Sequence, residues 1–178
     1  MSDEIPALSV TDSFMRAAYD QAVKSYREGG IPIGAVIVYR GEIIGAGHNS
    51  RVQRGNPLLH GEMAAYENAG RRAPAVYREC TLYTTHSPCS MCTGTTLLYK
   101  LPRVVIGEST GAAGITNYLN SGKTIDGFLR SVGLDVVVYD DPAPRELLAR
   151  FAREKPDVWA EDIGDDGDFV GPHIDRLT

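Results

Sequence analysis

Two short stretches carry side chains that can bind a metal ion and move a proton. The sequence HGE at residues 60–62 supplies an imidazole and a carboxylate, and PCSMC at residues 88–92 supplies two thiols at metal-ligand spacing. One histidine and two cysteines leave the fourth position of a tetrahedral zinc ion open for water, which is typical of catalytic zinc. We therefore expect one zinc ion per chain, bound by His60, Cys89 and Cys92.

Glu62 is the residue that would make such a zinc ion catalytic. Zinc lowers the pKa of its bound water from about 15.7 to about 7, and a nearby carboxylate can carry protons from that water to a ring nitrogen and then to a departing amine. We expect His60 and Cys89 each to lie at a helix start, where the partial positive charge stabilises thiolates. The pattern H-x-E followed by P-C-x-x-C is the known signature of zinc-dependent deaminases, so it predicts hydrolytic deamination with Glu62 as the catalytic residue.

A zinc ion that only holds the fold together is the alternative to this catalytic site. Structural zinc normally has four protein ligands. The remaining candidates are Cys80, His48, His86 and His173, and none belongs to a second paired motif. The alternative of a non-catalytic zinc-binding module is therefore the weaker one, and we expect Cys80 to be a small buried residue.

Composition places the chain among globular proteins of one domain. It has 178 residues, 43% of them hydrophobic, and a formal net charge of −5. An acidic chain of this kind does not favour nucleic acid as a partner, because phosphate binding needs clustered Lys and Arg. No apolar run is long enough to span a membrane, and the acidic start MSDEIPALSV lacks the features of a signal peptide. We expect a cytoplasmic protein without a membrane partner.

Apolar periodicity predicts an α/β fold, with helices on both faces of a five-stranded mixed sheet in three layers, α/β/α. Helices are expected at 13–28, with Ser13 as N-cap, and at 60–69, 89–100, 117–120 and 144–155, the last opened by Pro144. Strands are expected at 33–40, 42–49, 80–85, 103–108 and 134–140, the first two as an antiparallel hairpin. Residues 50–59 are expected to form a loop. We divide the chain into an N-terminal extension (1–12), a catalytic domain (13–164) and a C-terminal tail (165–178).

Beyond these motifs, the chain resembles the fungal-type zinc-dependent cytosine deaminases of the cytidine deaminase superfamily. The resemblance covers residues 14–164 and is strongest in EGGIPIGA, GHN, LHGE, TLYTTHSPCSMCTG and VWAEDIG. It implies a cytidine-deaminase-like fold, a homodimer, a role in pyrimidine salvage, and the same zinc ligands and proton carrier. It also implies contacts to the base from Asn49, the Gly61 backbone N–H, the Ser87 carbonyl, Trp159 and Asp162.

Two departures from the family pattern bear on the substrate. The family has a phenylalanine that closes over the ring after the fourth strand, whereas residues 109–114 here contain no aromatic residue, and His86 stands where an aliphatic residue is usual. Stacking on an aromatic ring contributes roughly 1–3 kcal/mol per base. The resemblance predicts conversion of free cytosine to uracil and ammonia, and the departures keep other amino-heterocycles (isocytosine, guanine, a triazine) and tRNA adenosine as alternatives.

Overall fold

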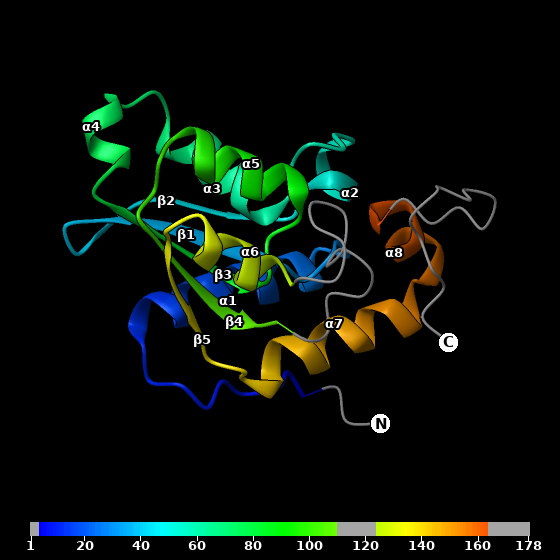
Figure 1. The fold of residues 1–178 in the computed structure, drawn as a ribbon. Helices are drawn as coiled ribbons and strands as arrows, with labels where there is room; N and C mark the ends of the chain where they lie inside the picture. Colours follow the sequence, from blue (N-terminus) through cyan, green and yellow to red (C-terminus); the bar gives the residue numbers. More distant parts are fainter. Residues whose placement is uncertain (1–3, 110–123, 164–178) are drawn as a thin grey trace.

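A computed structural model describes residues 4–109 and 124–163, and within them the expected α/β architecture is confirmed. A five-stranded mixed sheet has the order β2-β1-β3-β4-β5 (Figure 1). The β1 strand pairs antiparallel with both β2 and β3, and the remaining pairs are parallel. The strands are β1 (Gly34–Tyr39), β2 (Glu42–His48), β3 (Cys80–His86), β4 (Arg103–Glu108) and β5 (Asp135–Val138).

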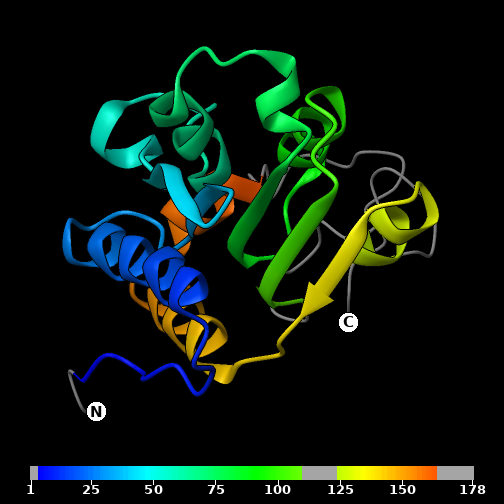
Figure 2. The same ribbon diagram turned by 90° about the vertical axis from the view of Figure 1, so that its left-hand side faces the viewer.

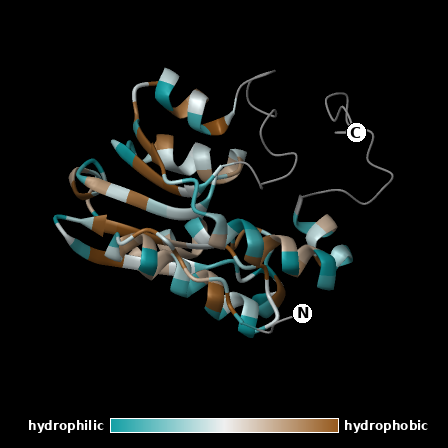
Figure 3. Ribbon diagram, turned by 90° about the horizontal axis from the view of Figure 1, so that it is seen from below, coloured by the Kyte–Doolittle hydropathy of each residue, from teal (hydrophilic) through white to brown (hydrophobic). Residues whose placement is uncertain are grey.

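Helices cover both faces of the sheet and form the two outer layers (Figure 2). One face carries α3 (Gly61–Ala69), α5 (Ser90–Leu98) and α6 (Ile125–Ser131), and the other carries α1 (Ser13–Arg27) and α7 (Pro142–Glu154). Alternate strand residues point to opposite faces. Apolar residues, brown in Figure 3, run along the strands. On β1, for example, Ala35 and Ile37 pack toward the first group of helices, and Val36 and Val38 pack toward α1.

The helix α3 packs against β2 at backbone distance. A Cβ atom on Gly47 would lie 2.5 Å from the backbone nitrogen of Ala65 in α3, so only glycine allows this approach. Because His60 is the N-cap of α3, this packing fixes where the first expected zinc ligand lies relative to the end of β2.

The N-terminal segment is tied to the helix that follows the sheet. The carboxylate of Asp141 accepts hydrogen bonds from the backbone nitrogens of Ser9 and Val10, and its other oxygen caps α7 at Ala143. Leu8 is buried between α1 and α7, which lie side by side in Figure 2. The division of the chain at residues 12 and 164 stays a prediction.

Several helix limits differ from expectation. The N-cap of α1 is Asp12, whose carboxylate accepts from the nitrogens of Phe14 and Met15, and Ser13 is the first helical residue. The helix α7 begins at Pro142 with Asp141 as N-cap, because that carboxylate satisfies a free first-turn N–H. Three short helices were not expected, and one of them interrupts the expected loop at 50–59. They are α2 (Arg51–Arg54), α4 (Pro74–Tyr77) and α6.

The chain after α7 turns into a further helix, α8 (Pro156–Ile163), which carries Trp159 and Asp162. The expected helix at 117–120, the aromatic-free stretch from residue 110 and the tail from 165 lie outside the described residues. Among the described helices, none combines the length and apolar character needed to cross a membrane.

Candidate active site

The three expected zinc ligands lie together where two helices begin. His60 is the N-cap of α3 and Cys89 is the N-cap of α5, and neither side chain makes the capping hydrogen bond usual at that position. Both side chains instead face Cys92. The ligand atoms of the three residues all lie within 4.8 Å of one another, with 3.4 Å from His60 Nδ1 to Cys89 Sγ and 3.6 Å between the two sulfurs.

This donor set fits a zinc ion with an open position. It offers one imidazole and two sulfurs, and no fourth side chain joins the cluster among the described residues. His48, Cys80 and His86 all lie outside it. The alternative of a fully protein-ligated structural zinc therefore has no support within residues 4–109 and 124–163, and His173 lies beyond them.

The two thiols differ strongly in acidity. The hydrogen bond with Cys92, followed by the nearby His60, lowers the pKa of Cys89 to about 4, although burial acts in the opposite sense. The pKa of Cys92 is raised by the same hydrogen bond and by burial. Burial opposes a charge on His60, but the bond to Cys89 and the charge of Asp162 outweigh it and raise the pKa of His60 to about 9. Zinc binding therefore has to displace protons from His60 and Cys92.

Glu62 lies in the first turn of α3 and reaches the metal cluster. One carboxylate oxygen lies 3.4 Å from Cys92 Sγ, and the other accepts a hydrogen bond of 3.1 Å from the hydroxyl of Thr84 on β3. Only 3% of Glu62 is exposed, and burial raises its pKa. A buried carboxylate with a raised pKa, next to the metal cluster, is suited to accept and release protons.

Asn49 and Asp162, which are far apart in the sequence, meet beside this cluster. Asn49 follows β2 and is fully buried, and its Nδ2 donates to Asp162 Oδ1 at 3.3 Å. The same Asp162 oxygen lies 3.5 Å from His60 Nε2, on the side of the ring away from Cys89. The structure thus brings the C-terminal helix α8 to the zinc ligands.

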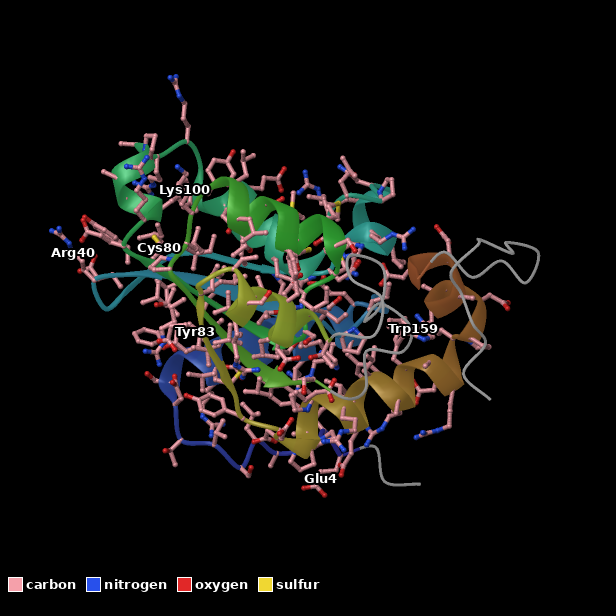
Figure 4. The ribbon with its side chains drawn as sticks, viewed as in Figure 1. Glu4, Arg40, Cys80, Tyr83, Lys100 and Trp159 are labelled. Atoms are coloured by element: carbon pink, nitrogen blue, oxygen red, sulfur yellow. The ribbon has the colours of Figure 1, made fainter. Side chains whose placement is uncertain are left out.

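Gly61 and Ser87 adjoin the metal ligands in the sequence, and Trp159 lies on α8 three residues before Asp162. A Cβ on Gly61 would lie 2.8 Å from the Ile33 carbonyl oxygen, so glycine lets α3 start close to the chain before β1. Ser87 is buried, and its nitrogen donates to the Glu108 carbonyl. Trp159 and Val158 pack against the buried side chains of Ile31, Leu148 and Phe151. Figure 4 shows Trp159 where α8 meets the rest of the protein.

Two residues that contact the site were not singled out from the sequence. Thr84 bonds Glu62, and Arg51 donates from Nη1 to Asp162 Oδ1 at 2.8 Å. Arg51 lies in the segment that was expected to form a loop, but its side chain is only 12% exposed. Its place two residues after Asn49 was the available signal.

His86 is buried beside Glu108 and outside the metal cluster. Its Nε2 lies 3.6 Å from Glu108 Oε1, and Arg145 Nε lies 3.4 Å from the other oxygen of that carboxylate. Burial lowers the pKa of His86 to about 4, although Glu108 acts in the opposite sense. His86 is therefore a neutral residue of the fold at neutral pH.

Comparison with known proteins agrees with this geometry. The family described as "Cytidine and deoxycytidylate deaminase zinc-binding region" matches residues 8–108, a stretch that contains all three expected zinc ligands and Glu62. The chain belongs to this family, which confirms the expected class of zinc-dependent hydrolytic deaminases.

Comparison with three individual proteins shows which members of the family the chain resembles. The chain is 48% identical to a cytosine deaminase of Candida albicans over 85% of its own length and 95% of that protein. It is 42% identical to a tRNA-specific adenosine deaminase of Streptococcus pyogenes, over 54% of its length and 61% of that protein. A guanine deaminase from Nitrosomonas europaea shares the fold, with a TM-score of 0.59 and 21% identity over 85% of this chain and 87% of that one.

Proposed function

We propose that this protein deaminates free cytosine to uracil and ammonia. The observation that carries the proposal is the 48% identity to a cytosine deaminase over 85% of this chain, a match too long to leave out the metal cluster. The similarity to the tRNA-specific relative covers only 54% of this chain. The acidic net charge of −5 also argues against a nucleic-acid substrate.

In the proposed reaction, His60, Cys89 and Cys92 hold the zinc ion and Glu62 moves the protons. Zinc supplies an attacking water of lowered pKa. Glu62 would take one proton from this water as its oxygen attacks C4, and would deliver that proton to N3 of the ring. It would then take the remaining proton from the hydroxyl on C4 and pass it to the amine as the C4–N bond breaks, so that cytosine and water become uracil and ammonia. Thr84 and the surrounding burial hold Glu62 in place for both transfers.

Binding of the base is assigned to residues on three sides of this cluster. Asn49 and Asp162 offer an amide and a carboxylate, and the first-turn N–H of Gly61 and the carbonyl of Ser87 complete the polar set. Trp159 would cover the site from α8. These roles follow from the family resemblance, and the meeting of Asn49, Asp162 and His60 supports them.

The cellular setting belongs to the same proposal. A role in pyrimidine salvage would follow from the cytosine reaction. A cytoplasmic location is supported by three cysteines that are all free thiols, since metal-binding thiols persist in reducing compartments. A homodimer is supported by Leu98 and Tyr99, exposed apolar residues at the end of α5, a helix without charged side chains. Light scattering on the purified protein tests the dimer.

Ammonia release from a substrate panel tests the reaction. The zinc-loaded protein should show its highest kcat/KM with cytosine, above isocytosine, guanine, a triazine, cytidine and adenosine in tRNA. Glu62→Gln should lower kcat by about 100-fold or more while zinc content stays at one per chain. Absence of ammonia from cytosine, or full activity of Glu62→Gln, would overturn the proposal.

A further inference from the structure

Arg51 forms hydrogen bonds with both Asn49 and Asp162, two of the side chains assigned to base binding. Its guanidinium donates to Asp162 Oδ1 at 2.8 Å, and its backbone nitrogen donates to Asn49 Oδ1 at 3.1 Å. A second nitrogen, Nη2, lies 3.2 Å from Glu161. Arg51 therefore joins the chain after β2 to the helix α8.

The contact to Asn49 fixes which way its amide group faces. Because Asn49 Oδ1 accepts from the Arg51 nitrogen, Nδ2 faces Asp162, where it donates at 3.3 Å. Both base-binding side chains are thus oriented by Arg51, one through its backbone and the other through its guanidinium.

The contact to Asp162 governs whether α8 can stay in place. The Asp162 side chain is 2% exposed, and a buried carboxylate is strongly unfavourable without a charged partner. Arg51 is the cation closest to it in the described structure, because His60 Nε2 lies farther away at 3.5 Å and His60 is needed neutral as a zinc ligand. Without Arg51, movement of α8 toward solvent would lower the free energy of the protein, because the Asp162 carboxylate would become hydrated.

The ion pair between Arg51 and Asp162 is more important because α8 and α2 are not closely packed against each other. An open groove of about 270 Å³ lies between the two helices, so continuous apolar packing does not join them there. Its walls are formed by Ile31, Arg51, Val52, Val158 and Glu161.

We propose that Arg51 is a positioning residue that holds α8 against the active site, so that Asp162 and Asn49 reach the base together. The link to the base depends on the proposed function, whereas the docking of α8 does not. Loss of Arg51 should weaken substrate binding more than the chemical step, because the contacts involved lie away from the reacting atoms and act equally in the ground and transition states.

The chain contains a matched control for this proposal. Arg54 lies on the same short helix and forms an ion pair with Glu67, but both side chains are about half exposed, and exposed pairs of this kind contribute little. Glu161 provides a second control, because it binds the same guanidinium from an exposed position. Replacing either residue leaves the buried pair of Arg51 and Asp162 intact.

Trp159 reports the position of α8 directly, because it is the only tryptophan of the chain. In Arg51→Gln, Trp159 emission should shift to longer wavelength, and KM should rise about tenfold or more with kcat within about threefold of the parent. Arg51→Lys should lie between the parent and Arg51→Gln, because an ammonium keeps the positive charge but not the planar geometry with which the guanidinium meets Asp162. Arg54→Gln and Glu161→Gln should match the parent in emission and KM.

The kinetic measurements use the base that the parent turns over fastest, after zinc content and thermal unfolding have shown that each variant is folded. Unchanged emission and KM in Arg51→Gln would overturn the proposal. A rise in KM without an emission shift, or a shift without a rise in KM, would also overturn it, because docking and binding would then be independent. A parent without activity on any base refutes the proposed function, and the emission of Arg51→Gln still decides whether Arg51 holds α8.

Discussion

The hydroxyl of Thr84 lies 3.1 Å from Oε1 of Glu62 and 3.0 Å from the carbonyl oxygen of His86, and Thr84 has no exposed surface. A hydroxyl has one proton to donate, so it can serve the Glu62 carboxylate or the carbonyl but not both at once. Because Glu62 is almost completely buried, this bond decides the direction in which its carboxylate points. The second oxygen is left facing Cys92 and the metal position.

Replacing Thr84 by valine should lower kcat by roughly 10- to 100-fold, because the proton carrier loses a hydrogen bond of about 1.5–3 kcal/mol that fixes its geometry. KM should change little, since Thr84 does not touch the base. Steady-state kinetics would show this, and Thr84→Ser, which retains the hydroxyl, should recover most of the activity. Thr96→Val removes an equally buried hydroxyl that bonds a helix carbonyl, and it should keep kcat near the parent value. Equal kcat values for Thr84→Val and Thr96→Val would refute the role of the bond.

Zinc removal should change the reactivity of one of the three thiols. Without zinc, Cys89 is partly exposed and its pKa is lowered to about 4, whereas Cys80 and Cys92 are both buried and have raised pKa values. A thiol reagent should therefore label the native protein slowly, label Cys89 after a chelator is added, and label the other two cysteines only on unfolding. Cys80→Ala should leave the chelator-dependent site unchanged. Rapid labelling of Cys80 in the folded protein would contradict this prediction.

His86 should make the protein less stable in acid. Burial lowers its pKa from 6.5 to about 4, so below pH 6.5 the unfolded chain binds a proton that the folded chain does not. The free energy of unfolding should consequently fall between about pH 6.5 and pH 4, by at most about 3 kcal/mol. The charged groups near His86 are Glu108 and, behind it, Arg145.

Urea unfolding at several pH values would measure this effect in the parent and in His86→Leu. The variant lacks the titrating group, so its stability should depend less on pH over that interval. The difference between the two curves separates His86 from the pH dependence of zinc binding. Curves that run parallel from pH 7 to pH 4 would show that His86 does not contribute.

Two glycines should respond to alanine with opposite signs. In Gly47→Ala, the new methyl group would collide with the backbone of α3, and the cost should be about 1–3 kcal/mol. Gly94 lies in the exposed part of α5 with no neighbouring atom within 4 Å of a new methyl group, so Gly94→Ala should stabilise the protein by up to about 1 kcal/mol. Thermal unfolding of both variants would test this. Stabilisation by Gly47→Ala would mean that α3 and β2 do not pack as closely as described.

The parts of the fold that follow from local chemistry were predictable. Apolar runs placed all five strands, and helical spacing or strong helix formers placed α1, α3, α5 and α7. The short helices α2, α4 and α6 were missed because their few turns hold too little periodic signal, and their stability comes from tertiary contacts. Asp12 rather than Ser13 caps α1, since both residue types are good caps and only the backbone geometry separates them.

The candidate site likewise contains residues that could be identified from the sequence and residues that could not. His60, Glu62, Cys89 and Cys92 were identifiable because a metal site requires particular side chains at particular spacings. Arg51 and Thr84 were not, because their roles depend on partners 111 and 22 residues away that meet them only in three dimensions. An arginine two residues after Asn49 has no chemistry of its own until α8 is placed beside it.

The helix α8 lies outside the region that the family match covers, which ends at residue 108. The residues expected to activate water are all inside that region, whereas Asp162 and Trp159 are contributed by a separate stretch at the far end of the described chain. In the proposed site, part of the contact with the base therefore comes from a segment separate from the one that carries the zinc ligands and Glu62. Exchange of α8 between relatives, in evolution or by protein engineering, would therefore be a way to change which base binds without changing the zinc ligands or Glu62.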